Sequence, residues 1–116
     1  MSASCTITNN TGSAIIITNM GTVNDDAAFT APAVGTTIQN GDNFTISMGN
    51  DSVFFAPRGV GFNFGFICQG NFTLGGIYLD DPAVGAHQFS YSNTAVFNYP
   101  TQNPGGNVYT IQIELA

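Results

Sequence analysis

Charged side chains are scarce in this sequence, and positive ones are almost absent. Only 7% of the 116 residues are charged, against about 25% in an average soluble domain. Seven acidic residues face one cation, Arg58, there is no lysine, and the formal net charge is −6. Sequence-independent nucleic-acid binding needs Lys and Arg to neutralise phosphates, and attraction to anionic lipid headgroups needs the same side chains. The shortage of cations therefore excludes a nucleic-acid partner and electrostatic attachment to anionic membranes.

Further absences argue against an enzyme. His87 is the only histidine, and no serine lies in a strand-to-helix turn of the hydrolase kind, so no catalytic triad is indicated. Two cysteines with a single histidine cannot build a standard structural zinc site. No segment has helical periodicity, so no glycine-rich phosphate loop precedes a helix. We expect no enzymatic activity and no bound cofactor, and we expect His87 to be a partly exposed strand residue.

Long apolar runs are missing as well. The longest aliphatic run, residues 15–17, is far too short to span a bilayer. The first five residues contain neither the basic segment nor the apolar run of a secretory signal peptide. Three interpretations stay open: a cytoplasmic protein, export without such a signal, or a sequence that begins after its natural start.

What the sequence does contain is alternation of apolar and polar residues over short segments. Turn residues interrupt the alternation about every 8–12 positions, which is typical of a sandwich or barrel. No linker, low-complexity block or internal repeat divides the chain. The sequence predicts one all-β domain over residues 1–116, an antiparallel β-sandwich or jelly roll of about eight or nine short strands.

Individual segments fit this expectation. Residues 5–8 and 14–18 are predicted to form a hairpin, and residues 23–34 to form a loop. Gly75 and Gly76 are expected to bend or bulge the strand that contains them. The remaining strands are predicted at 44–48, 53–56, 61–68, 71–79, 87–91, 95–99 and 108–115.

The strongest core signal lies in residues 61–68, where Phe62, Phe64, Phe66 and Cys68 share one face of the predicted strand. Burying a phenylalanine contributes about 1.5–3 kcal/mol, so this face is expected to form the core. Cys5 falls in another predicted strand. Two buried thiols, or a disulfide joining the two strands, are both consistent with the pattern.

Two pairs of adjacent carboxylates are weak calcium candidates. They are Asp25 with Asp26, and Asp80 with Asp81, which precedes Pro82 in a predicted turn. Adjacent residues on a strand point to opposite faces, so only a loop could aim both carboxylates of a pair at one ion. Asp-Asp-Pro is also an ordinary turn sequence, and acidic residues in turns are more common than calcium ligands. No other metal site is indicated.

Several segments together resemble the aegerolysins, small acidic β-sandwich proteins that recognise membrane lipids. Thr6–Gly12 with Ile15–Asn19 is similar to the first strand pair of that family. Residues 38–49 resemble its middle strand, Ile77–Pro82 with Gly85 and Phe89 resembles its aromatic-acid-proline segment, and Val108–Leu115 resembles its closing strand. The resemblance implies a sandwich fold, binding to a sphingolipid or another membrane lipid, and a separate pore-forming protein as a possible partner. The family uses tryptophans at the membrane face, whereas this chain has none.

Two functions from different classes follow. The first is a recognition module for a neutral ligand, a membrane lipid or a glycan, since tyrosine favours the headgroup level and Asn, Thr and Gln bind hydroxyl groups without charge. The residues expected to contact such a ligand are Tyr78, Asp80, Asp81, His87, Tyr91 and Tyr99. The second is a self-assembling subunit of a fibre, shell or crystalline protein, because no lysine guards a strand edge. In the predicted strands at 94–99 and 108–115 only Glu114 opposes edge pairing, so a homo-oligomer is expected.

Overall fold

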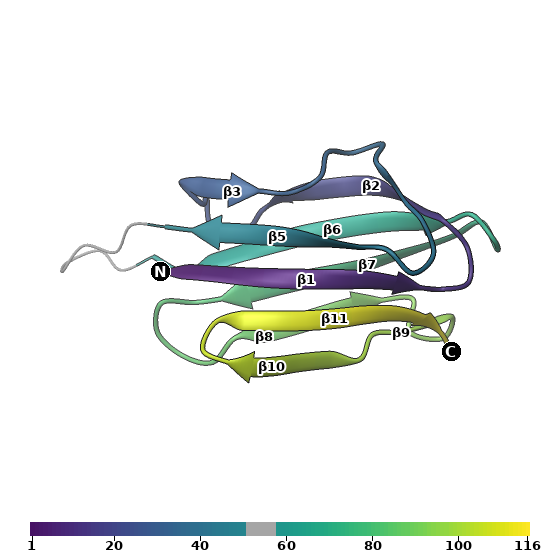
Figure 1. Ribbon diagram of the computed structural model, residues 1–116. Coiled ribbons are helices and arrows are strands. Elements are labelled where there is room, and N and C mark those ends of the chain that lie inside the picture. The colour runs from purple at the N-terminus through teal and green to yellow at the C-terminus, as the bar shows by residue number, and fades with distance from the viewer. Residues whose placement is uncertain (51–57) are drawn as a thin grey trace.

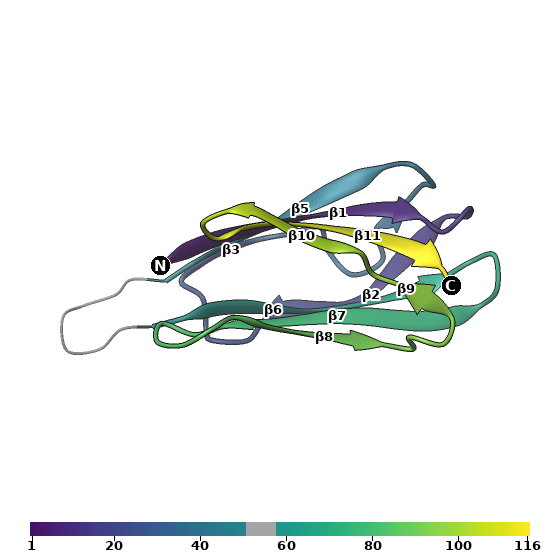
Figure 2. The ribbon, with the colours of Figure 1, turned by 90° about the horizontal axis from the view of Figure 1, so that it is seen from below.

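The computed structural model describes residues 1–50 and 58–116, which form two β-sheets packed face to face (Figures 1 and 2). No helix occurs in these two ranges. Sheet A has the strand order β10-β11-β1-β5-β3, with β9 also paired to β11, and sheet B has the order β4-β2-β6-β7-β8. The strands are β1 (Ser2–Asn10), β2 (Ile15–Thr22), β3 (Ala28–Thr30), β4 (Thr37–Ile38), β5 (Asn43–Gly49), β6 (Val60–Cys68), β7 (Thr73–Asp81), β8 (Gln88–Ser92), β9 (Phe97–Asn98), β10 (Thr101–Gly105) and β11 (Val108–Leu115). The predicted all-β sandwich is confirmed.

Alternation along the strands builds the core between the two sheets. Phe62, Phe64 and Phe66 point inward from β6 and are almost completely buried. Phe64 meets Phe44 of sheet A edge to face, with ring centroids 5.3 Å apart, a favoured arrangement for aromatic pairs. The prediction that this face of residues 61–68 forms the core is confirmed. The other buried residues of the core include Cys5, Ile7, Ile15, Ile17, Ile46, Met48, Ile77, Leu79, Tyr109, Ile111 and Ile113.

The predicted hairpin at the start of the chain is wrong. Strand β1 pairs with β5 and β11 in sheet A, whereas β2 pairs with β4 and β6 in sheet B. The chain therefore crosses from one sheet to the other in the turn between β1 and β2. The buried Asn9 stabilises this turn through its side-chain hydrogen bonds. Asn9 Nδ2 donates to the carbonyl oxygens of Ser13 (2.8 Å) and Ile38 (3.0 Å). Alternation shows that each strand has a buried face, but it does not say which sheet contains the strand.

One strand pair departs from the predicted antiparallel pattern. Strands β1 and β11 pair in parallel, with Ser4 opposite Val108 and Asn10 opposite Glu114. The first and last strands thus lie side by side in the middle of sheet A (Figure 1). The self-assembly hypothesis treated residues 108–115 as a possible edge strand. This is wrong, because β11 lies between β10 and β1.

The expected break at Gly75 and Gly76 does not occur. Strand β7 keeps a continuous register with β6 from Thr73 to Asp81. Gly75 instead makes room for packed aromatic rings, because a Cβ there would lie 2.4 Å from Phe66 Cζ and 2.7 Å from the hydroxyl oxygen of Tyr99. At Gly76 a Cβ would lie 2.9 Å from the backbone carbonyl oxygen of Phe64 on the neighbouring strand. The register shift in sheet B lies in β2, between Ile17 and Asn19.

Three other predictions have separate outcomes. The predicted loop at 23–34 contains the short strand β3, and the predicted strand at 53–56 lies outside the described residues. Cys5 and Cys68 are both buried and unpaired, so the two thiols of the first alternative are present and the disulfide is not. Burial raises the pKa of the Cys5 thiol to about 12.

Candidate functional site

The turn between β6 and β7 exposes a phenylalanine at one end of the sandwich. Phe72 is 82% exposed, and its backbone has φ 51°, a left-handed conformation that bulky residues rarely adopt. Asn71 fixes this turn, because its side-chain oxygen accepts a hydrogen bond from the Thr73 amide at 3.1 Å. The local sequence therefore holds an aromatic ring in water on a strained backbone.

Further apolar side chains surround this turn. Ile16, Ile67 and Leu74 occupy neighbouring positions on the outer face of sheet B, since Ile67 pairs with Ile16 on one side and Leu74 on the other. Leu74 is exposed, and the exposed Leu115 lies at the same end of the molecule. We call these five residues, Ile16, Ile67, Phe72, Leu74 and Leu115, the apolar end.

A hollow of about 230 Å³ lies next to the apolar end, and Leu115 is the residue that the two share. Its lining combines apolar surface with hydroxyl and amide groups, and the hydroxyls bond within the protein. Ser13 Oγ lies 3.2 Å from the Cys68 sulfur and accepts the Gly70 amide at 2.9 Å, while Thr11 Oγ1 donates to Asn9 Oδ1 at 2.8 Å. The hollow is lined by Thr11, Gly12, Ser13, Cys68, Gly70, Asn71 and Leu115, none of which is charged. Hydroxyl and amide groups next to exposed apolar side chains could hold a neutral polar group attached to a hydrocarbon chain.

A second surface is the outer face of sheet A, which carries rows of short polar side chains. Thr6 lies between Thr45 and Thr110 across three neighbouring strands, and the hydroxyls of Thr6 and Thr45 are 2.9 Å apart. We define the hydroxyl face as the outward residues Ser2, Ser4, Thr6, Thr8, Asn43, Thr45, Ser47, Thr110 and Gln112.

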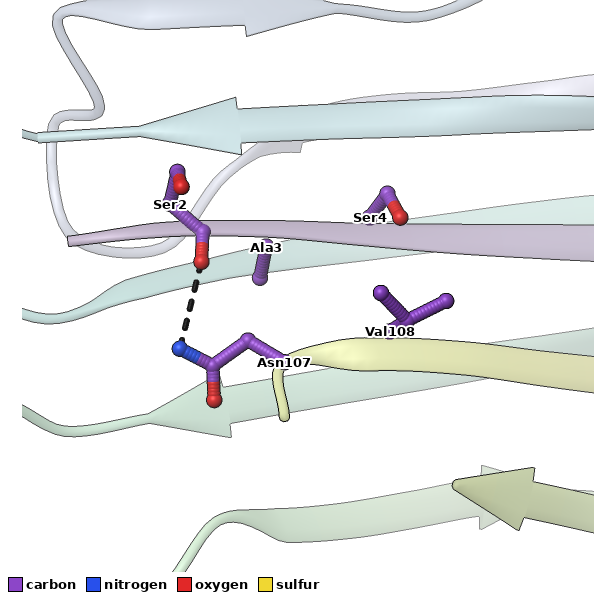
Figure 3. A pocket seen from close by; sticks show the side chains of 5 residues that line it. All are labelled: Ser2, Ala3, Ser4, Asn107 and Val108. Atoms are coloured by element: carbon purple, nitrogen blue, oxygen red, sulfur yellow. Dashed lines mark hydrogen bonds between the residues drawn. The ribbon is translucent and has the colours of Figure 1, made fainter. Parts of the chain in front are cut away.

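One end of the hydroxyl face is hollowed between β1 and β11. This depression, of about 330 Å³, is lined by Ser2, Ala3, Ser4, Asn107 and Val108. Figure 3 shows the Ser4 and Val108 side chains on either side of it, and the Asn107 amide donating to the Ser2 carbonyl oxygen at 3.2 Å. A smaller hollow of about 110 Å³ follows along the same strands, beside Thr6 and Thr110. The face can donate and accept hydrogen bonds without contributing charge.

The six residues predicted to contact a ligand separate into two groups. Tyr78 and Asp80 lie on the outer face of sheet B, with Tyr78 partly exposed. The others lie between the sheets or along their open side. Asp81 is 4% exposed and accepts a hydrogen bond from Tyr109 at 3.0 Å. The structure therefore does not bring the six residues together as one surface.

The open side of the sandwich, between β8 and β10, is lined with aromatic rings. Tyr91 stacks on Tyr99 with ring centroids 5.0 Å apart and on Phe89 at 6.0 Å, and His87 meets Tyr109 at 5.0 Å. Tyr99 is only 8% exposed, and its hydroxyl donates to the Ser92 carbonyl and accepts the Gly76 amide. The Tyr91 hydroxyl bonds to that of Thr101. Burial raises the pKa of both Tyr91 and Tyr99. Tyr91 and Tyr99 therefore stabilise the packing of the two sheets, whereas His87 is exposed.

The carboxylates proposed for calcium do not converge. Asp81 points into the core, and Asp80 accepts a hydrogen bond from Asn24 Nδ2 at 3.3 Å. Asp26 accepts one from the Gly61 amide at 3.4 Å, and burial raises its pKa. Asp25 lines a shallow hollow with Arg58. Among residues 1–50 and 58–116, no three His, Cys, Asp or Glu side chains are grouped so that they could hold a metal ion.

Sequence reasoning missed Phe72 because it extended the strand of residues 71–79 through this position. The preceding Gln69-Gly70-Asn71 is a turn sequence, and it could have indicated that the residue after it lies at the tip of a turn. The exposure of Phe72 follows from that turn, which alternation alone does not reveal.

Comparison with known proteins supports the fold. No protein-family model matches the sequence, and no curated protein matches it either. The chain is similar in structure to IP-1A from Alcaligenes faecalis, a crystal structure, with a TM-score of 0.66 and 17% sequence identity over 99% of this chain and 91% of that chain. In the part of the chain described, no helix is long and apolar enough to cross a membrane.

Proposed function

We propose that this protein recognises a membrane lipid with a neutral or zwitterionic headgroup, and that its apolar end enters the membrane interface. The exposure of Phe72 is the observation that carries the proposal. Transferring a phenylalanine side chain out of water contributes about 1.5–3 kcal/mol. Exposed apolar clusters on soluble domains commonly mark such contact surfaces.

The strained backbone of Phe72 supports the same function. A non-glycine residue in the left-handed region costs about 1–2 kcal/mol, and such strain is found most often at functional positions. Neither packing nor solubility gains from an aromatic ring here. Contact with another molecule would explain why an aromatic residue occupies this position.

Charge argues for the type of lipid. With a net charge of −6 and one cation, the protein is repelled by anionic headgroups. The uncharged hollow next to the apolar end combines apolar surface with hydroxyl and amide groups, which suits the headgroup and first chain segment of a sphingolipid-type lipid. The resemblance of the sequence to the aegerolysins supports this choice of ligand, and it also suggests a separate pore-forming protein as the partner.

Co-sedimentation with liposomes tests the proposal. Vesicles of phosphatidylcholine alone and with added sphingolipid are compared with a lipid-free tube, and we expect pelleting only with the sphingolipid vesicles. Phe72→Ser should weaken binding roughly ten- to hundredfold, which corresponds to the burial energy of one phenylalanine.

Val84→Ser is the matched control, because Val84 is also 82% exposed but lies in the β7–β8 loop at the opposite end of the sandwich (Figure 1). It should bind like the unmodified protein. Equal loss in both variants, or full binding by Phe72→Ser, would exclude the apolar end as the contact site.

The hydroxyl face favours a second function, binding of a neutral glycan. Its shallow hollow between β1 and β11 (Figure 3) presents several hydrogen-bonding groups and no charge. A glycan array probed with the unmodified protein and with Ser4→Val tests this alternative. Loss of glycan binding in Ser4→Val, but not in Thr18→Val on the outer face of sheet B, would assign the glycan to the hydroxyl face.

A further inference from the structure

The exposed edges of the two sheets are not equally protected against pairing with another strand. Natural edge strands are guarded by short length, proline, bulges or charge. Strand β3 has three residues and β4 has two, while β10 contains Pro104 and an irregular register beside it. Strand β8 has five residues, Gln-Phe-Ser-Tyr-Ser, without proline or charge. Within the described residues it pairs on one side only, with β7. Among the edge strands of the described part of the chain, only β8 combines this length with none of the four protections.

The side chains of β8 are complementary to those of a second copy. If two β8 strands pair antiparallel about Ser90, Phe89 of each copy lies opposite Tyr91 of the other on the inner face. Cross-strand aromatic pairs of this kind stabilise a sheet. On the outer face Gln88 lies opposite Ser92, and Ser90 lies opposite Ser90. No like charges meet along the pair, although each chain carries a net charge of −6.

The edge is also held in an extended form before pairing. The rings of Phe89 and Tyr91 are stacked nearly parallel, with an angle of 7° between their planes. Phe89 rests edge to face on Tyr109 at 5.2 Å, and Tyr91 stacks on Tyr99. Phe89 and Tyr91 are both only partly buried. A rigid strand loses little conformational freedom on pairing, and the neighbouring copy would cover the remaining aromatic surface.

We infer that β8 is a self-association edge, at which two copies join their five-stranded sheets into one continuous sheet. The contact is isologous, so it uses the same edge of both copies and closes at the dimer. The occupant is therefore a second copy of this chain, and the product is a discrete dimer rather than a filament. The inference is independent of lipid binding, because β8 and the apolar end share no residues.

Sedimentation equilibrium of the full chain over a wide concentration range tests the inference. We expect a reversible monomer–dimer equilibrium in the unmodified protein without lipid. Ser90→Lys brings two lysines opposite each other at the centre of the pair, and like charges in that position oppose pairing. It should shift dissociation to at least tenfold higher protein concentration. Ser47→Lys, on the exposed face of a central strand, is the matched control and should dimerise normally.

A charge exchange makes the test specific to β8. Ser90→Glu alone should be as monomeric as Ser90→Lys, whereas an equimolar mixture of the two should form a heterodimer, because opposite charges then face each other. Circular dichroism verifies that each variant keeps its β structure. A protein that is monomeric at every concentration, a dimer that tolerates Ser90→Lys, or a mixture that does not associate would each overturn the inference.

Discussion

The Tyr109 hydroxyl donates a hydrogen bond of 3.0 Å to Asp81 Oδ2 inside the sandwich. This bond joins β11 of sheet A to the last residue of β7 in sheet B. The ring of His87 lies against Tyr109, with centroids 5.0 Å apart. Asp81, the only buried carboxylate within residues 1–50 and 58–116, thus takes part in a link between the two sheets.

Replacing Tyr109 with phenylalanine should destabilise the protein while keeping the ring in place. The substitution removes a donor to a buried carboxylate, which costs about 1–3 kcal/mol or more for a charged group. Urea unfolding at neutral pH, followed by circular dichroism, should show a lower midpoint with an unchanged slope. A midpoint equal to that of the unmodified protein would mean that the bond contributes nothing.

The same pair predicts a loss of stability in alkali. Burial, together with the bond to Asp81 and the charge of Asp81, raises the pKa of Tyr109 to about 12, whereas an unfolded tyrosine titrates near 10. Between these pH values the unfolded chain has lost the proton that the folded chain keeps, so the free energy of unfolding falls as pH rises. Tyr109→Phe should show a shallower fall than the unmodified protein. Tyr91, Tyr99 and Cys5 contribute to the fall in both proteins.

Most of the core could be predicted from the sequence because a period of two is a local property. Phe62, Phe64 and Phe66 alternate with smaller or polar residues, and one buried face follows directly from that spacing. The pairing of β1 with β11 could not be predicted in this way. It joins Ser4 to Val108, and alternation contains no information about such distant partners.

The candidate site was harder to predict than the core. Asp80 and Asp81 are neighbours in sequence, but they point to opposite faces of β7, so only Asp80 reaches the surface. Tyr99 is a residue type that often contacts ligands, yet its packing over Gly75 buries it. Phe72 falls in the strand predicted at 71–79, but the turn extends through residue 72 and the strand begins only at Thr73. Surface positions depend on turns and on partner strands, which single-sequence patterns describe poorly.

Gly75 should be sensitive to substitution although it lies in a regular strand. An added Cβ would lie 2.4 Å from Phe66 Cζ and 2.7 Å from the Tyr99 hydroxyl oxygen, in a core that has no free space on that side. We expect Gly75→Ala to lower the free energy of unfolding by about 1–3 kcal/mol, as overpacking does. Gly105→Ala is the control, since a Cβ at Gly105 meets nothing within 4 Å. Thermal unfolding of both variants measures the difference, and equal stability would contradict the expected clash.

Phe72→Asn should stabilise the fold while it weakens lipid binding. Asparagine tolerates the left-handed backbone better than phenylalanine, and little packing is lost because the ring is mostly in water. We expect a gain of about 1 kcal/mol, measured by urea unfolding. Val84→Asn should not show the gain, since Val84 is not among the residues with positive φ. If Phe72→Asn is less stable than the unmodified protein, the ring contributes to packing and the functional interpretation of its strain is wrong.

Lipid binding at the apolar end and pairing at β8 together predict that the dimer connects two membranes. Ser90 pairs with Tyr78, and Phe72 lies six residues from Tyr78 along the chain, or about 20 Å at the rise of a β-strand. Antiparallel pairing about Ser90 directs the two Phe72 side chains to opposite ends of the dimer, about 40 Å apart. A membrane that lies across the ends of the strands can receive only one Phe72, so a dimer bound in that orientation leaves the other Phe72 free for a second vesicle.

Turbidity of sphingolipid vesicles measures this tethering. The unmodified protein should raise turbidity at concentrations where it dimerises. Ser90→Lys should bind vesicles with its single apolar end but should not aggregate them, and Phe72→Ser should do neither. If Ser90→Lys aggregates vesicles as strongly as the unmodified protein, tethering does not depend on β8. If the dimer binds without aggregating vesicles, its two Phe72 side chains do not enter separate membranes, and the tethering prediction is wrong.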